Sequence, residues 1–116
     1  MIKKHTISIK NALAGLKWAI RTQPNYRVHF SLSLLALLGS YYWHVSSGEF
    51  LLIIFLITIG LVIETVNTAI EETTDAIDKK WRDDIKIAKD VSAAAMLIFA
   101  LGSVIIASLI FIPKIF

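Results

Sequence analysis

The 116-residue sequence contains no cysteine, which excludes disulfides and thiolate metal ligands. It also lacks the phosphate-binding loop G-x-x-x-x-G-K-[ST] and the glycine-rich loop and Asp-Phe-Gly motif of protein kinases. Its three histidines, His5, His29 and His44, do not have the spacing of metal ligands, and no Ser-His-Asp arrangement is suggested. Basic residues are not interleaved with aromatic residues on a soluble face, which argues against binding to nucleic acid.

What the sequence does contain is apolar surface. Hydrophobic residues make up 56% of the chain, with a mean hydropathy of +0.68. A soluble domain of this length buries too little of its chain to hide that much apolar surface. Three apolar runs, at about residues 28–45, 50–70 and 91–112, approach or reach the roughly 20 residues that a helix needs to cross a bilayer. We therefore predict a single all-α domain, residues 1–116, that is an integral membrane protein with three transmembrane helices.

The residues before the first run predict an amphipathic helix at about residues 5–22. Its apolar residues recur at spacings of four, three and four, which places them on one stripe, while the basic residues lie off that stripe. The stripe comprises Ile9, Leu13, Leu16 and Ile20. A basic amphipathic helix beside a membrane span is expected to lie on the membrane surface.

Charge is distributed unevenly along the chain. The first 27 residues carry six basic residues and no acid, residues 71–90 carry five basic residues, and residues 45–49 carry none. The positive-inside rule therefore predicts that the N-terminus and the 71–90 segment are cytoplasmic. We expect the basic N-terminal region to belong to the mature protein, because it is too long for the charged part of a signal peptide.

Polar residues interrupt the second run in a regular pattern. On one continuous helix, at about 100° per residue, five polar side chains would share a single face. These are Glu64, Asn67, Glu71, Asp75 and Asp78. A carboxylate at membrane depth, such as that of Glu64, is costly and indicates a functional site. The alternative for the residues from Glu71 to Asp78 is an ordinary solvated helix beyond the span.

A second polar cluster, Lys86, Lys89 and Asp90, comes just before the third run. The two lysines could simply extend from the end of the span to water. Asp90 could be the N-cap of the last helix. The small residues from Ser92 to Ala95 that follow would allow close packing of helices.

Three motifs together resemble the prokaryotic diacylglycerol kinase family, which includes undecaprenol kinases. They are Glu64-Thr-Val-Asn67-Thr-Ala-Ile-Glu71 followed by Asp75, then Ala88-Lys89-Asp90, and the segment from Asn25 to His29 before the first span. The order and spacing match over nearly the whole chain. The resemblance implies a homotrimer in the prokaryotic plasma membrane that moves the γ-phosphate of ATP to the hydroxyl of a membrane lipid.

The resemblance also implies residue roles. Glu64 would be the general base on the lipid hydroxyl, and Arg27 would also belong to the lipid site. Glu71 would bind the Mg²⁺ ion that bridges the ATP phosphates, supported by Asn67. The remaining nucleotide contacts would be Asp75, Lys89 and Asp90. The family usually has a second metal-binding glutamate at the position of Gln23, which offers only a neutral carbonyl oxygen.

The spacing suits this chemistry, since the seven residues from Glu64 to Glu71 span about 10 Å of helix. That separation fits a lipid hydroxyl at one end and a metal-bound phosphate at the other. Undecaprenol and diacylglycerol remain equally open as acceptors. A small ion or proton channel that uses Glu64, or a membrane adaptor without catalysis, are the alternatives from other classes.

Overall fold

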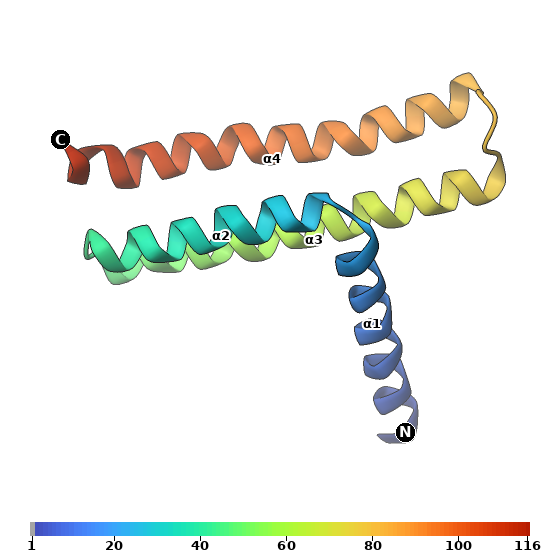
Figure 1. Cartoon of the computed structure of the whole chain (residues 1–116), viewed down its shortest axis with the longest axis horizontal. Helices are drawn as coiled ribbons and strands as arrows, with labels where there is room; N and C mark the ends of the chain where they lie inside the picture. Colours follow the sequence, from blue (N-terminus) through green and yellow to red (C-terminus); the bar gives the residue numbers. More distant parts are fainter. Residues whose placement is uncertain (1) are drawn as a thin grey trace.

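The computed structural model describes residues 2–116, which form four α-helices and no strand. These are α1 (Ile2–Thr22), α2 (Asn25–Tyr42), α3 (Ser47–Ile77) and α4 (Asp83–Ile115). Helices α2, α3 and α4 run alongside one another, whereas α1 leaves the bundle at a steep angle (Figure 1). The prediction of an all-α fold is confirmed.

Two helices, α3 and α4, are long and apolar enough to cross a membrane. With 31 and 33 residues, they extend about 46 and 50 Å, which exceeds the roughly 30 Å of a bilayer core. Only five hydrophobic residues in the described chain are buried, and large side chains such as Leu51, Ile98 and Leu109 are exposed. This outward apolar surface is that of a protein surrounded by lipid.

The helix boundaries correct two details of the sequence interpretation. Helix α3 ends at Ile77, and Asp78 has an extended backbone, so Asp78 does not continue the polar face of the helix. Its carboxylate instead accepts a hydrogen bond of 2.9 Å from the backbone N–H of Lys80 in the following turn. Helix α4 begins seven residues before Asp90, with Arg82 at its N-cap, so Asp90 is not the N-cap.

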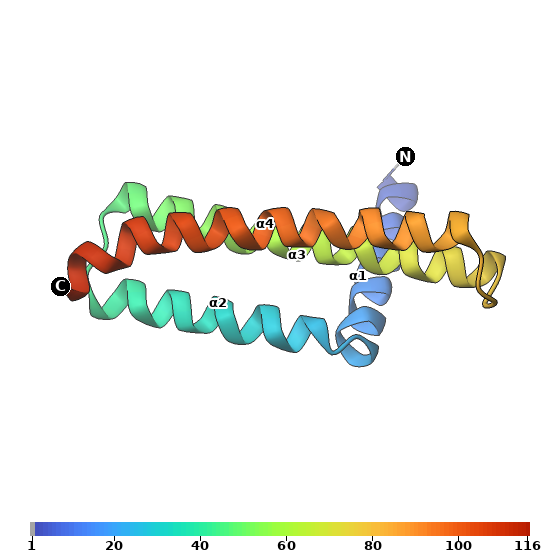
Figure 2. The same cartoon turned by 90° about the horizontal axis from the view of Figure 1, so that it is seen from above.

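Helix α3 is the centre of the bundle, since α1, α2 and α4 all pack against it. Seen from above, α2 and α4 approach each other near the C-terminus and diverge towards α1 (Figure 2). Where they approach, the Phe111 ring of α4 lies so close to Gly39 of α2 that a Cβ atom there would be 3.3 Å from it. The Phe111 ring also meets Trp43 edge-on, with centroids 6.0 Å apart.

The turn between α2 and α3 is fixed by a capping box. The Ser46 side chain accepts a hydrogen bond from the backbone N–H of Glu49, and the Glu49 carboxylate accepts one from the backbone N–H of Ser46. Lys114 near the end of α4 donates a hydrogen bond of 2.9 Å to the same carboxylate. The hydrogen bonds that the Glu49 carboxylate accepts, chiefly from the backbone N–H of Ser46 and then from Lys114, lower the pKa of Glu49 to about 2. The Glu49 carboxylate thus links the turn between α2 and α3 to the end of α4.

Candidate active site

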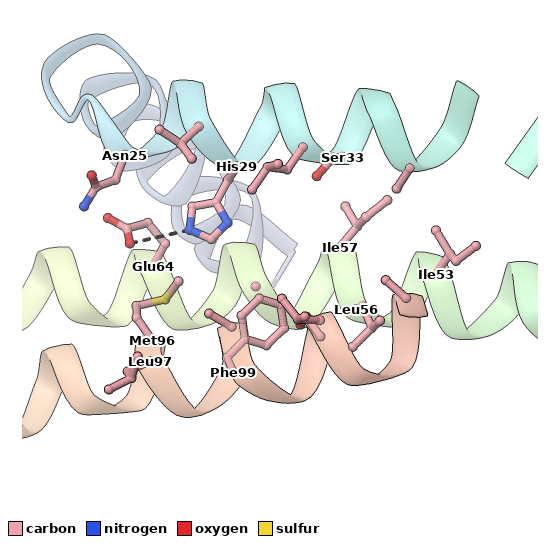
Figure 3. A pocket seen from close by; sticks show the side chains of 18 of the residues that line it. Asn25, His29, Ser33, Ile53, Leu56, Ile57, Glu64, Met96, Leu97 and Phe99 are labelled. Atoms are coloured by element: carbon pink, nitrogen blue, oxygen red, sulfur yellow. Dashed lines mark ion pairs between the residues drawn. The ribbon is translucent and has the colours of Figure 1, made fainter. Parts of the chain in front are cut away.

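Helices α2, α3 and α4 line an open cavity of about 690 Å³. Most of its lining is apolar and extends to Ile110 and Phe111, where α2 and α4 approach each other. Its polar groups include the side chains of Glu64, Asn67 and Glu71 along α3. Figure 3 shows the side chains of Glu64 and His29 pointing towards each other in this cavity, with Phe99 nearby. The cavity therefore joins an apolar space to a carboxylate.

Glu64 is the most deeply buried charged residue of the described chain, with a relative exposure of 2%. Its Oε2 atom lies 3.7 Å from Nε2 of His29, which comes from α2. Burying a carboxylate is costly unless it finds a partner. A carboxylate held in such a place is suited to accept a proton from a bound hydroxyl group, because little water competes for it.

Asn67, one turn beyond Glu64, is held by a buried network. The Ser92 hydroxyl of α4 donates a hydrogen bond of 2.6 Å to Oδ1 of Asn67. The amide Nδ2 of Asn67 donates in turn to Oε1 of Glu71, at 3.3 Å. Ser92 thus fixes which way the amide points, and the amide orients the Glu71 carboxylate.

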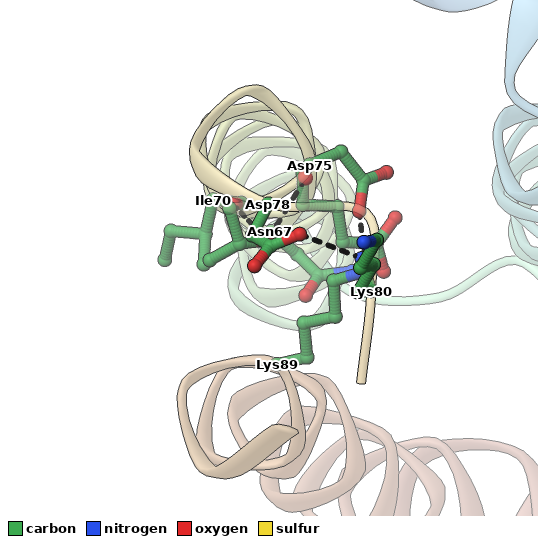
Figure 4. A network of polar contacts seen from close by, with 8 residues as sticks. Asn67, Ile70, Asp75, Asp78, Lys80 and Lys89 are labelled. Atoms are coloured by element: carbon green, nitrogen blue, oxygen red, sulfur yellow. Dashed lines mark hydrogen bonds and ion pairs between the residues drawn. The ribbon is translucent and has the colours of Figure 1, made fainter. Parts of the chain in front are cut away.

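Asp75 and Lys89 form a pair between α3 and α4 at the end of the bundle near residues 78–82. The Lys89 Nζ atom donates a hydrogen bond of 2.6 Å to Oδ1 of Asp75, as Figure 4 shows. This hydrogen bond, followed by the charges of Asp75 and Glu71, raises the pKa of Lys89 above its usual range. Asp90 is exposed and pairs with Lys86 on its own helix. A fixed ammonium group therefore lies near Glu71 and Asp75.

Two residues that the sequence assigns to the site, Arg27 and Gln23, do not line the cavity. Arg27 is exposed and does not line it, so its assignment to the lipid site stays a prediction. Gln23 lies in the turn between α1 and α2, where its amide donates to Thr22 at 3.4 Å. Residues 2–116 contain no group of three or more His, Asp or Glu side chains placed to hold a metal ion.

The Glu71 carboxylate nevertheless fits a metal ion that arrives with phosphate. Asn67 orients one of its oxygens, and Mg²⁺ in phosphoryl-transfer enzymes is commonly held by one or two carboxylates together with substrate phosphates and water. Glu71 alone supplies one such carboxylate, which is the minimum for this kind of site. A metal role for Gln23 stays a prediction.

Sequence reasoning missed three contributors to this site. From the sequence, His29 receives no role beyond its place in a motif and is excluded as a metal ligand, and Ser92 is treated only as a small residue for packing. Tyr26 is completely buried, and its hydroxyl lies 2.7 Å from that of Thr65, next to Glu64. The only available signals were that Tyr26 and His29 lie in the motif at the start of α2 and that Ser92 lies two residues after Asp90.

Comparison with known proteins identifies the family to which the chain belongs. The sequence profile described as prokaryotic diacylglycerol kinase matches residues 10–111, which is most of the chain. The chain belongs to the prokaryotic diacylglycerol kinase family. As a member it is a lipid kinase of a prokaryotic membrane, and the channel and adaptor alternatives are set aside.

Individual relatives agree with the family. The chain is 36% identical over 107 residues to an undecaprenol kinase of Bacillus subtilis, covering 92% of this chain and 87% of the relative. It is 31% identical over 87 residues to a diacylglycerol kinase of Pseudomonas aeruginosa, covering 75% and 71%. A diacylglycerol kinase of Synechocystis is 27% identical over 108 residues, covering 92% of this chain but only 62% of the relative.

Proposed function

We propose that this family member transfers the γ-phosphate of ATP, with Mg²⁺, to the hydroxyl of undecaprenol or diacylglycerol in the membrane. The observation that carries the proposal is the position of Glu64. Its buried carboxylate lies in a largely apolar cavity, on the same helix as the polar network of Asn67 and Glu71. An apolar chain would occupy the cavity and present its terminal hydroxyl to Glu64.

In this mechanism Glu64 accepts the proton as the lipid oxygen attacks the γ-phosphorus. The bond between that phosphorus and the β–γ bridging oxygen breaks, ADP leaves with that oxygen, and the lipid becomes a phosphate monoester. Such transfers depend mainly on positioning and charge stabilisation. The spacing of about 10 Å between Glu64 and Glu71 leaves room for the hydroxyl and the phosphate between them.

The nucleotide would bind around the end of α3 and the start of α4. Glu71 is the residue that would hold the Mg²⁺ ion, with Gln23 as a weaker second ligand, and the ion would neutralise phosphate charge. Asn67 orients Glu71, and Lys89, kept protonated by Asp75, offers a positive charge to the phosphates. Asp90 would complete the nucleotide contacts, and Arg27 would approach the lipid head.

The same proposal includes a membrane arrangement. Helix α2 would be the third transmembrane helix, because it runs beside α3 and its 18 residues extend about 27 Å. Helix α1 would lie on the cytoplasmic surface, with the N-terminus and the 78–82 turn also cytoplasmic. Three copies would form a homotrimer, in which neighbouring chains cover the exposed apolar faces and complete the sites.

The direct test is transfer of labelled phosphate. The purified protein in lipid–detergent micelles is given γ-labelled ATP and either undecaprenol or diacylglycerol, with and without free Mg²⁺. The proposal expects labelled lipid phosphate with at least one acceptor, and loss of transfer when a chelator removes Mg²⁺. Absence of labelled product with both lipids, from protein that remains folded, would refute it.

A further inference from the structure

His29 is a polar residue of the cavity to which the proposed mechanism gives no task. It lies one turn after Asn25 on α2, and its side chain is 16% exposed. Within residues 2–116, His29 is the only basic side chain within 4.0 Å of the Glu64 carboxylate. The carboxylate that would remove the hydroxyl proton therefore has one basic neighbour, on another helix.

The depth of His29 relative to Glu64 is fixed by an adjacent contact. The Thr65 hydroxyl donates to the backbone oxygen of Leu61 at 2.7 Å, so the Tyr26 hydroxyl is the donor in the 2.7 Å contact with Thr65. Tyr26 is three residues before His29, and Thr65 is next to Glu64. The fully buried tyrosine thus sets the register of α2 against α3 at the pair.

The two ring nitrogens of His29 face different surroundings. Nε2 points to Glu64, whereas Nδ1 lies 3.6 Å from the position that a Cβ atom at Gly60 would occupy. That same position is 2.7 Å from the Phe99 ring, so Gly60 leaves the space that the ring fills beside the histidine. The Gly60 backbone and the Phe99 ring therefore lie near the Nδ1 side of His29.

We propose that His29 is a positioning residue for Glu64. It donates its Nε2–H to Oε2 of Glu64, which directs the other carboxylate oxygen towards the lipid hydroxyl. The 3.7 Å separation is longer than a hydrogen bond and closes when substrate binds, as is common for catalytic contacts. His29 exchanges no proton in the reaction: the hydroxyl proton goes to Glu64. This inference rests on the proposed function.

Two matched substitutions test the role of Nε2. The amide nitrogen of Gln reaches the place of Nε2, whereas the shorter amide of Asn reaches only that of Nδ1. We expect His29→Gln to retain most of the wild-type kcat. His29→Asn should lower kcat by on the order of tenfold to a hundredfold, because a displaced catalytic group loses its alignment. The KM for ATP should stay unchanged in both, since His29 lies away from the nucleotide residues.

The dependence on Glu64 is tested in a Glu64→Asp background, in which the carboxylate is withdrawn from His29. There, His29→Gln and His29→Asn should have equal residual kcat, because coupled residues give non-additive effects. His5→Leu, which removes an exposed imidazole from α1, is the control and should leave kcat unchanged. Thermal unfolding of each variant verifies that the fold is retained.

The outcomes separate this inference from the function on which it rests. Equal kcat for His29→Gln and His29→Asn in the wild-type background would overturn the positioning role, even if Glu64 proves essential. A difference that persists in the Glu64→Asp background would also overturn it. If the wild-type protein phosphorylates neither lipid, the proposed function fails and the role of His29 fails with it.

Discussion

At the residue scale, the site depends on a few buried polar atoms, of which the Ser92 hydroxyl is the most telling. Ser92→Ala would leave Oδ1 of Asn67 buried without its 2.6 Å partner, at a cost of about 1–3 kcal/mol. We expect a lower melting temperature and a kcat reduced roughly tenfold, because Asn67 would no longer hold Glu71 in place.

A second serine provides the control for stability. The Ser103 hydroxyl is also buried in α4 but has no hydrogen-bond partner among the described residues. Ser103→Ala should therefore leave the melting temperature unchanged or slightly raise it, since it removes an unsatisfied polar group. Thermal unfolding in the same detergent compares the two variants. Equal effects would show that the Ser92–Asn67 bond does not stabilise the helix pair.

How far the residues could be predicted depends on whether the controlling geometry is local. The positions of Glu64, Asn67 and Glu71 along the cavity followed from helical periodicity, which acts within one element. Asp78 was misplaced because the helix ends one residue earlier, and that ending is set by the turn. His29 and Ser92 were missed because each acts on α3 from another helix, and a single sequence does not show which faces meet.

At the element scale, the Asp75–Lys89 pair joins α3 to α4 where the nucleotide is proposed to bind. Both side chains are partly exposed, so solvent screens the pair and it contributes little to stability. Lys89→Ala should therefore remain folded but raise the KM for ATP severalfold, with a smaller change in the KM for lipid, because a phosphate contact is lost.

Steady-state kinetics with varied ATP and varied lipid measure this separation. Lys79→Ala, which removes an exposed charge from the turn between α3 and α4, should leave both KM values unchanged. If Lys89→Ala behaves like Lys79→Ala, the lysine serves only to reach water at the end of the membrane span.

The stabilisation that Glu49 provides at the opposite end of α3 should depend on pH. The pKa of Glu49 is lowered from 4.5 to about 2, chiefly by the backbone N–H of Ser46 and then by Lys114. A lowered pKa in the folded state means that the stabilisation is complete above pH 4.5 and disappears as the pH falls through about 2. Glu49→Gln should therefore melt lower than wild type at pH 7. The melting temperatures of the two proteins should converge as the pH falls from 4.5 to 2, and a constant difference between them would contradict this assignment.

At the scale of the whole molecule, the described residues include far more exposed than buried large apolar side chains, as expected for a chain surrounded by lipid. Symmetric trimers build equivalent sites between neighbours. If the proposed sites combine α3 of one chain with α4 of the next, then mixing inactive Glu64→Gln chains with weakened Lys89→Ala chains should restore activity. In a cyclic trimer that contains both kinds of chain, about a third of the sites, one of the three, would combine both native residues.

Complementation is measured on mixed trimers purified through two different tags. Activity no higher than that of the separate variants, in trimers shown to contain both chains, would place each site within one chain.

At the scale of the whole molecule, the fold class was predictable from composition, because long apolar runs directly indicate helices that contact lipid. Assembly was not, since it depends on contacts between copies.

The central claim is that the buried Glu64 carboxylate is the base for phosphate transfer to a lipid hydroxyl. The most direct measurement compares wild type with Glu64→Gln, which keeps the size of the side chain and removes its charge. Labelled lipid phosphate and Mg²⁺-dependent ATP binding are measured on the same preparations. The account predicts that phosphate transfer falls by about a hundredfold or more while ATP binding is retained. Near-normal transfer by Glu64→Gln would contradict it.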